Sequence, residues 1–418
     1  MLKRQPMLKI ITIFVLFLCF SSAFAIGYAY FDKTVNTQNN TMTIGDWGIP
    51  ITTPKEFYDF ATKTNSSSTD RYYLFNDIDF SGYNWTYNNT TANVIFRGTL
   101  DGNGKKISNL TLYQNNRSYQ YIGIFPIMQG GSVYNLTLEN VYLSLGSTSL
   151  GRTVLQAGLI AGNVNGSTNT ISNITIINAG VRGTSSAGAG GLIGSVTSSA
   201  TVLNINNIKA TNLKVFNKSS NSGGIIGAIN SSGANVTISD IDIQGEVYSY
   251  GTASHTGGIV GRIASGGKLN VNRAIVDMTS RNTLETSSTY NNRYSNEYLG
   301  GFIGRNESTS SNVFIYDAFF TGGLVTNSST YRRYIGTAIG RSGGSFTSGR
   351  IYYANVLVRL SNNSISTNTS ESFYGTNAEL VLRDSMPNSS WWTGFKTNFD
   401  SANNLWTQDS TGRLVLNR

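Results

Sequence analysis

A Gly-apolar-apolar-Gly signature recurs seven times and constrains the fold more than any other feature of the chain. The second positions of successive copies are 35, 33, 33, 34, 43 and 36 residues apart. A near-constant period of this length is typical of solenoids built from stacked repeats. The copies occupy residues 122–125, 157–162, 190–194, 223–227, 257–261, 300–304 and 335–340.

A second element follows each signature about 12–16 residues later. In it, apolar residues flank a polar pair that contains Asn or Asp, which predicts two short strands meeting at a corner. Asn and Asp suit a corner because they tolerate unusual backbone angles and bond nearby backbone groups. Stacking in register predicts a hydrogen-bonded corner ladder of Asn109, Asn135, Asn173, Asn207 and Asp240.

One repeat cannot bury its apolar residues alone, so the repeats are expected to stack into a continuous core. The composition agrees, because 45 Gly and only 5 Pro suit tight corners and interior strands that need their N–H donors. Aromatic residues make up 11% of the chain, which argues against disorder. The sequence therefore predicts an all-β parallel β-solenoid of about seven to eight coils.

The opening coil carries a resemblance to a known family. Residues 96–112, which begin Phe-Arg-Gly-Thr-Leu-Asp-Gly-Asn-Gly, and the preceding strand 73–80 resemble GLUG-motif repeat proteins. The resemblance extends over residues 50–410 and implies a right-handed parallel β-helix on an exported surface protein. The family is defined by its repeat, so the resemblance implies a fold and no particular reaction.

Both ends of a solenoid need covering. Thr53, Pro54 and Glu56 form a helix-start pattern, with Thr53 as the N-cap. This predicts a helical cap within 51–95, ahead of the solenoid at 96–360. The cap's apolar face consists of Phe57, Phe60 and Ala61. A C-terminal coil and aromatic cap are expected in 361–418, with Trp391, Trp392, Phe395, Phe399 and Trp406.

Residues 1–30 have the layout of a secretory signal, with three basic residues ahead of an apolar run. Ala-Phe-Ala at 23–25 predicts cleavage after Ala25. The next residues, through the extended segment 31–50, resemble the N-terminus of TasA/camelysin-type matrix proteins, and that resemblance implies SipW-class processing near Ala29. An uncleaved membrane anchor is the alternative. The expected location is secreted or cell surface.

Charge and chemistry-bearing residues exclude several function classes. The net charge of +9 is scattered without a Lys/Arg run, so no nucleic-acid partner is expected. The only Cys, Cys19, lies in the apolar run, so disulfides are not expected. No metal or cofactor site is expected, because Cys/His ligand spacings are missing.

Two carboxylate pairs and one histidine are the candidates for catalysis. Asp77/Asp79 and Asp240/Asp242 have the i, i+2 spacing that places both groups on one strand face. The first pair falls in the opening strand and Asp240 falls at a corner, which favours structural roles. His255 is the only His. We therefore predict a non-catalytic protein.

The 43-residue spacing marks an insertion, and solenoid insertions commonly form the binding face. Its candidate binding residues are Tyr290, Asn291, Asn292, Arg293, Tyr294 and Tyr298. The prediction is a protein of adhesion, matrix or envelope that binds a carbohydrate or protein ligand. The alternatives are a polysaccharide-active enzyme on the same fold and a self-associating subunit of a filament or surface layer.

Overall fold

The computed structural model describes two units, Met1–Ile49 and Pro50–Arg418, which we treat separately. In the first unit, strand β1 (Val35–Thr37) pairs antiparallel with β2 (Asn40–Met42). The described residues of the whole chain are 35–37, 40–42, 48–62, 70–86, 94–114, 121–145, 156–183, 188–217, 220–250, 254–283, 296–308, 312–326, 332–343, 346–353, 358–359, 365–366, 378–380, 406–410 and 414–416.

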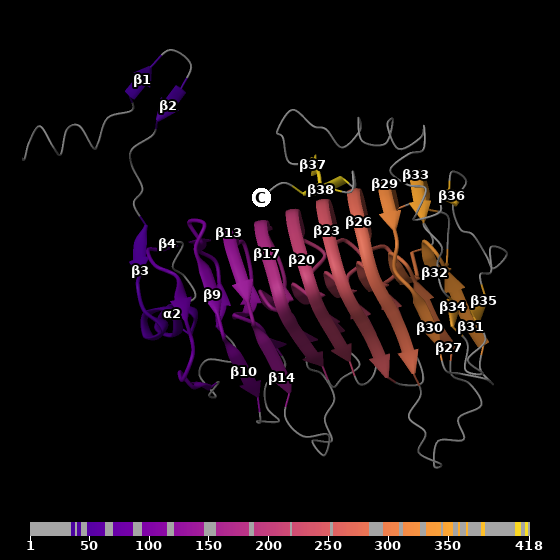
Figure 1. Cartoon of the computed structure of the whole chain (residues 1–418), viewed down its shortest axis with the longest axis horizontal. Helices are drawn as coiled ribbons and strands as arrows, with labels where there is room; N and C mark the ends of the chain where they lie inside the picture. Colours follow the sequence, from indigo (N-terminus) through magenta and orange to yellow (C-terminus); the bar gives the residue numbers. More distant parts are fainter. Residues whose placement is uncertain are drawn as a thin grey trace, which may run out of the picture. The chain divides into compact units, whose positions relative to one another are not determined.

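The second unit is a parallel β-solenoid, which confirms the predicted fold class (Figure 1). Its largest sheet has 19 strands, and its long strands β17, β20, β23 and β26 pair in parallel, each with the next coil. The strands of this sheet are β3 (Ile49–Ile51), β4 (Arg71–Leu74), β5 (Ile78–Asp79), β6 (Trp85–Thr86), β8 (Thr99–Asp101), β9 (Lys106–Ser108), β10 (Thr111–Gln114), β13 (Ser132–Glu139), β14 (Tyr142–Leu145), β17 (Thr168–Gly183), β20 (Val202–Asn217), β23 (Asn235–Tyr250), β26 (Lys268–Thr283), β29 (Val313–Phe320), β30 (Leu324–Thr326), β33 (Thr347–Tyr353), β34 (Val358–Arg359), β35 (Ile365–Ser366) and β36 (Ala378–Leu380).

Two smaller parallel sheets contain the Gly-apolar-apolar-Gly signatures. The seven-stranded sheet consists of β11 (Tyr121–Ile122), β15 (Gln156–Ala157), β18 (Gly188–Gly190), β21 (Asn221–Gly223), β24 (His255–Gly257), β27 (Asn296–Gly300) and β31 (Arg332–Gly336). The eight-stranded sheet consists of β7 (Ile95–Phe96), β12 (Phe125–Met128), β16 (Ala161–Val164), β19 (Ile193–Val196), β22 (Ile226–Ile229), β25 (Val260–Ile263), β28 (Ile303–Asn306) and β32 (Ile339–Ser342).

Each signature contains a connection between these two sheets, three residues long at 158–160 and two residues long in the other copies. Its last glycine brings a strand of one sheet against the backbone of the other. A Cβ at Gly304 would lie 2.5 Å from the backbone nitrogen of Thr256, closer than real Cβ contacts come. The glycine therefore allows the two sheets to touch backbone to backbone.

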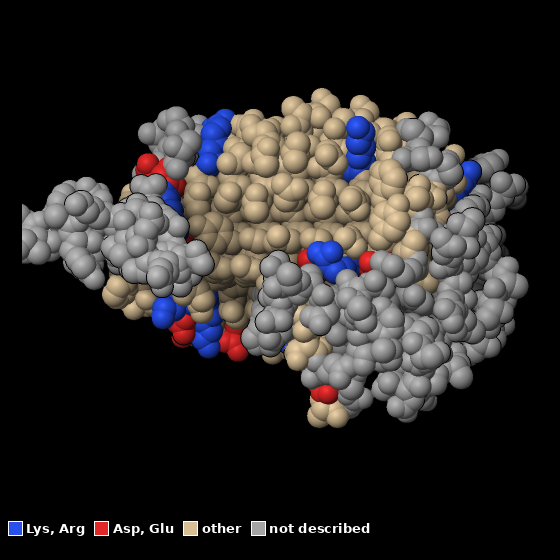
Figure 2. Space-filling model, turned by 90° about the horizontal axis from the view of Figure 1, so that it is seen from above, with Lys and Arg blue, Asp and Glu red and all other residues tan. Residues whose placement is uncertain are grey.

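Aliphatic side chains fill the core in matching rows. Ile193, Ile226, Val260 and Ile303 occupy one register position in successive coils and are fully buried. Apolar residues at the same position of every coil bury one another, which is why the signature repeats. Figure 2 shows one face of the molecule on which charged side chains are few among the described residues.

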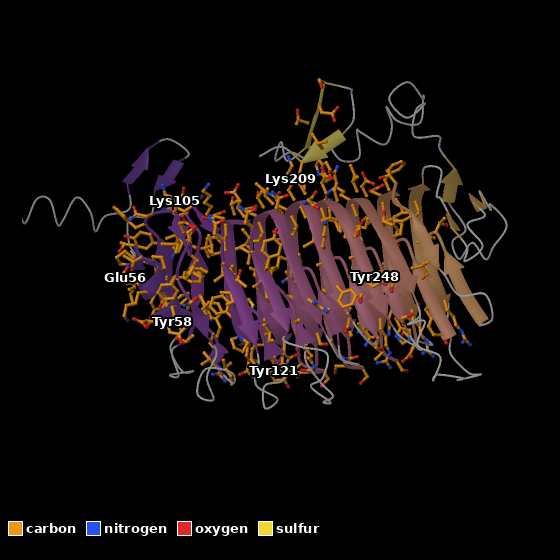
Figure 3. The ribbon with its side chains drawn as sticks, turned by 60° about the horizontal axis from the view of Figure 1, so that its bottom comes forward. Glu56, Tyr58, Lys105, Tyr121, Lys209 and Tyr248 are labelled. Carbon is orange, nitrogen blue, oxygen red and sulfur yellow. The ribbon has the colours of Figure 1, made fainter. Side chains whose placement is uncertain are left out.

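The predicted helical cap is present as α2 (Pro54–Ala61). The Thr53 side chain accepts a bond from the Glu56 backbone N–H at 3.2 Å. The Glu56 carboxylate binds Thr52, with both the backbone N–H and the hydroxyl donating at 2.7 Å, so the reciprocal bond falls one residue earlier than a standard capping box. Phe57 is fully buried against Phe80 and Trp85. Figure 3 places Glu56 and Tyr58 of α2 beside the first strands of the solenoid. In the described part of the chain, no helix is long and apolar enough to cross a membrane.

Strand stacking begins earlier than the predicted start at residue 96. β4 and β5 already pair in parallel with β8 and β9. Near the C-terminus, β37 (Trp406–Gln408) and β38 (Leu414–Leu416) form an antiparallel hairpin. Trp406 of this hairpin bonds Asp240 of β23, in the middle of the solenoid, and does not cover an end. The predicted cap residues Trp391, Trp392, Phe395 and Phe399 lie outside the described residues.

Candidate functional site

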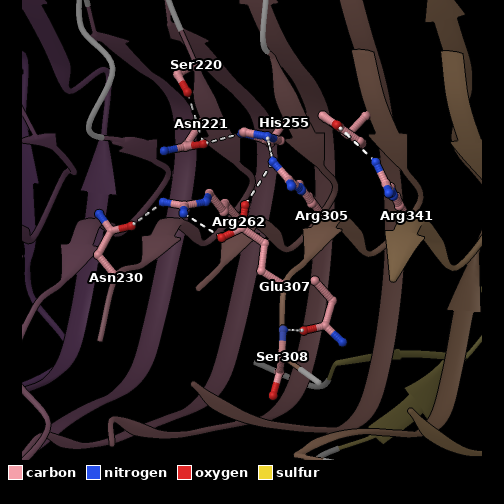
Figure 4. Close-up of polar contacts among 11 residues, drawn as sticks. Ser220, Asn221, Asn230, His255, Arg262, Arg305, Glu307, Ser308 and Arg341 are labelled. Carbon is pink, nitrogen blue, oxygen red and sulfur yellow. Dashed lines mark hydrogen bonds and ion pairs between the residues drawn. The ribbon is translucent and has the colours of Figure 1, made fainter. Parts of the chain in front are cut away.

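Three arginines form a row across the eight-stranded sheet. Arg262 of β25 is opposite Arg305 of β28, which is opposite Arg341 of β32. Parallel neighbours lie about 4.8 Å apart, so three like charges stack at the coil spacing. We call Arg262, Arg305 and Arg341 the arginine row (Figure 4).

One carboxylate serves two of these arginines. Glu307, just after β28, accepts an ion pair from Arg262 at 2.5 Å through Oε2 and from Arg305 at 2.8 Å through Oε1. The side chains of Arg262 and Arg305 are 29% and 30% exposed, so the row is reachable from solvent. Glu307 is shared, so Arg262 and Arg305 together have one carboxylate for two positive charges.

Buried aromatic side chains support the row. The Tyr298 ring stacks on the His255 ring with centroids 4.9 Å apart. The Arg305 guanidinium lies over the Tyr298 ring at 4.7 Å, and Arg341 donates to the Tyr298 hydroxyl at 3.4 Å. These cation–π and hydrogen-bond contacts orient the guanidinium groups.

His255 is neutral in this setting. Burial, together with the positive charges of Arg305 and Arg262, lowers its pKa from 6.5 to about 3. Its Nδ1 lies 2.6 Å from the Asn221 side-chain oxygen and its Nε2 lies 3.3 Å from Arg305. The arrangement requires Nδ1 to donate to Asn221 and Nε2 to accept from Arg305. The ring therefore adds no charge to the row.

The sequence contains a signal for this row that our sequence analysis missed. In three successive copies the last glycine of the signature is followed by arginine, at 261–262, 304–305 and 340–341. In the three copies before them the same place holds Asn163, Ser195 and Ala228. Comparing one position across copies would have found the row.

The predicted binding loop contributes one residue to the described structure. Tyr298 lies in strand β27 and is only 2% exposed, so it is a buried support of the arginine row and not an exposed loop residue. The insertion ends before this strand, which pairs with β24 and brings Tyr298 beside His255. The predicted residues Tyr290, Asn291, Asn292, Arg293 and Tyr294 lie outside the described residues.

The corner asparagines form two rows. Asn207 donates to Asn173 at 2.6 Å, and Asn173 donates to Asn135 at 2.9 Å. Asn109, which the prediction places in this row, instead donates to Asp79 at 2.8 Å and accepts from Asn140 at 3.2 Å. The register pairs Ser108 with Glu139, so the next residue, Asn109, stands opposite Asn140. Asn109 thus belongs to a second corner row.

Asp240 occupies the next position of the first row, where an ion pair with Arg273 replaces the hydrogen bond between two asparagines. Arg273, in the next coil, donates to both carboxylate oxygens of Asp240 at 2.6 and 2.5 Å. The Trp406 indole N–H donates to the same carboxylate at 2.9 Å. Arg273 and Asp317 keep the left-handed backbone of the corner, with φ of 53° and 51°. The Asp240 carboxylate is thus held in structural contacts.

The other candidate carboxylates also have structural contacts. Asp77 accepts from the Lys106 backbone N–H at 2.9 Å. The hydrogen bond from Asn109, together with those from the backbone N–H and hydroxyl of Ser81, lowers the pKa of Asp79. Asp242 is buried, at 4% exposure. Among the residues that the structure describes, no group of three or more His, Cys, Asp or Glu could hold a metal ion.

Comparison with known proteins supports the fold and leaves the activity open. No family model and no curated protein matches the chain. A solved structure that resembles it is the crystal structure of a "putative immunoglobulin A1 protease" from Bacteroides ovatus, with a TM-score of 0.55 and 16% identity over 88% of this chain and 91% of that one. At this identity the likeness concerns the β-solenoid fold alone.

Proposed function

We propose that this chain is an exported, non-catalytic β-solenoid that binds a ligand at the cell surface or in the extracellular matrix. The N-terminal signal pattern and the resemblance to GLUG-motif surface proteins support export. The arginine row carries the binding role, because it is a partly exposed cationic surface that is built by three consecutive repeats. We expect this binding to attach the protein to a host, a neighbouring cell or matrix.

A hydrolase is the second candidate, since the similar solved structure is named as a protease. A Ser–His or Cys–His mechanism requires a histidine that can take a proton from the nucleophile. His255 is the only histidine of the chain, its Nε2 faces the Arg305 guanidinium, and its pKa is about 3. His255 is thus a weak base whose free nitrogen already accepts a hydrogen bond, and this favours the binding role over hydrolysis.

The experiment that tests the proposal is a binding array of glycans and matrix proteins, probed with the purified protein. Specific binding without cleavage of the ligand supports the proposal. Cleavage of any arrayed glycan or of immunoglobulin A, monitored by mass spectrometry, would replace it with the hydrolase. A blank array together with normal cell attachment in a deletion strain would reject the adhesion role.

Self-association into a filament or surface layer stays a prediction. Electron microscopy of the purified protein tests it, and monomers alone would argue against it.

A further inference from the structure

Within the binding role proposed above, on which this inference rests, we infer that the arginine row binds a linear polysaccharide carrying carboxylate or sulfate groups. Three features of the row fit such a ligand: its periodicity, its excess charge and its neighbours.

The row presents cations at a regular interval along the solenoid axis. The three arginines occupy one register position of adjacent parallel strands, so their backbone positions recur at about 4.8 Å and their guanidinium groups follow the same row. A linear polymer with an acidic group on each sugar also carries charge at regular short intervals. A polymer lying along the axis can therefore meet several guanidinium groups at once, and each contact raises the effective concentration of the next.

The excess charge of the row is fixed in place. Glu307 pairs with two of the arginines, and Arg262 also donates to the Asn230 side chain at 3.2 Å. A planar guanidinium that is already oriented loses less entropy when it binds an oxyanion, and its paired N–H groups match carboxylate and sulfate oxygens. Stacked like charges repel each other, so a bound polyanion relieves a cost that Glu307 offsets only in part.

The neighbours of the row suit a sugar better than a nucleic acid. A partly exposed amide stands beside the arginines, since Asn230 accepts a hydrogen bond from Arg262 at 3.2 Å. Such groups exchange hydrogen bonds readily with sugar hydroxyls. The aromatic rings that the described side chains place at the row, Tyr298 and His255, are buried, so these rings offer no face on which bases could stack.

The test measures binding of the purified protein to polygalacturonate, with dextran as the neutral control polymer. The unmodified protein should bind polygalacturonate, should lose affinity as salt is raised, and should ignore dextran. The combined substitution Arg262→Gln, Arg305→Gln and Arg341→Gln should weaken binding by about tenfold or more. A matched control, Lys105→Gln, Lys214→Gln and Lys268→Gln, removes the same charge from the 19-stranded sheet and its turns and should change affinity less than about twofold.

A gain-of-function variant keeps the test decisive if the triple arginine variant fails to fold. Glu307→Gln removes the carboxylate that competes with the ligand, so it should bind polygalacturonate more tightly, by about threefold or more. A purely structural arginine row predicts no gain. The single variants Arg262→Gln, Arg305→Gln and Arg341→Gln should each bind polygalacturonate more weakly than the unmodified protein.

Several results would overturn the inference. Equal losses in the arginine and lysine variants would mean that diffuse charge attracts the polymer. Tighter binding to polyuridylate than to polygalacturonate would indicate a nucleic-acid surface. Unchanged binding of the arginine variants to polygalacturonate would reject the row as the site, and binding of the protein to another glycan on the array would then leave the binding role intact.

Discussion

Acidification should destabilise the protein through His255. The folded state holds this side chain neutral, with a pKa of about 3 against 6.5 for an ordinary histidine. The unfolded chain takes up a proton as the pH falls through 6.5, whereas the folded chain does not until about pH 3. The unfolded state therefore binds more protons in this window, so stability is intact above pH 6.5 and is lost as the pH falls.

The size of this loss follows from the pKa difference. Each pKa unit corresponds to about 1.4 kcal/mol of difference between the two states. Lowering the pH from 6.5 to 5.0 should therefore reduce the free energy of unfolding by about 2 kcal/mol through His255 alone. Carboxylates titrate mainly below this window, which keeps the histidine contribution separate.

Two assays check the reasoning. The chain has one histidine, so the imidazole signal in a proton NMR spectrum belongs to His255 without further assignment. It should show no titration between pH 8 and pH 5. Urea unfolding at pH 6.5 and 5.0 should show the loss in the unmodified protein and a much flatter dependence in His255→Gln.

Two results would show that His255 does not cause the loss of stability. A titration midpoint near 6 would show that burial and the neighbouring arginines do not hold the ring neutral. Equal pH dependence in the unmodified protein and in His255→Gln would assign the loss to other groups. Fluorescence and circular dichroism must report coincident transitions, because a long repeat array can unfold in stages.

Three further changes test the packing. Asp240→Ala should cost about 1–3 kcal/mol, because it removes the carboxylate that binds the partly exposed Arg273. Asp240→Asn should cost clearly less, because asparagine suits this corner. Hydrogen exchange of β23 and β26 measures both effects. Gly304→Ala should lower the stability measured by thermal unfolding by about 1–3 kcal/mol. Gly343→Ala is the control and should be near neutral, because its Cβ would lie 3.4 Å from the nearest atom, the Asn306 backbone oxygen. Thr53→Ala should cost about 1 kcal/mol by removing the cap of α2, seen as faster exchange of the helix amides, and an unchanged rate would contradict the capping role.

Much of the fold was predictable because its causes are local and repeat. The glycine and apolar positions of each signature identify the coils, since every coil must bury the same face. Thr53 and Pro54 identify the start of α2 for the same reason: capping involves only neighbouring residues. The hydrogen bond from Asn173 to Asn135 joins equivalent corner positions of successive coils.

The site was less predictable because its members come from different coils. Tyr298 follows a long insertion and looks like a loop residue, yet its pairing with β24 places it beside His255. Asn109 looks like the other corner residues, yet the register assigns it to a different row. Neither assignment can be made from one repeat in isolation.

The sequence by itself determined that this protein is a stack of β-coils, because residue type and period specify which face each coil must bury. The tertiary structure alone decided which polar side chains meet. Arg305 forms part of a row only because Glu307 pairs with it and Arg262 and Arg341 flank it. The neutrality of His255 depends on burial and on guanidinium groups from other coils. Electrostatic interactions act through space at a few ångströms, so only the register between coils brings these groups within reach.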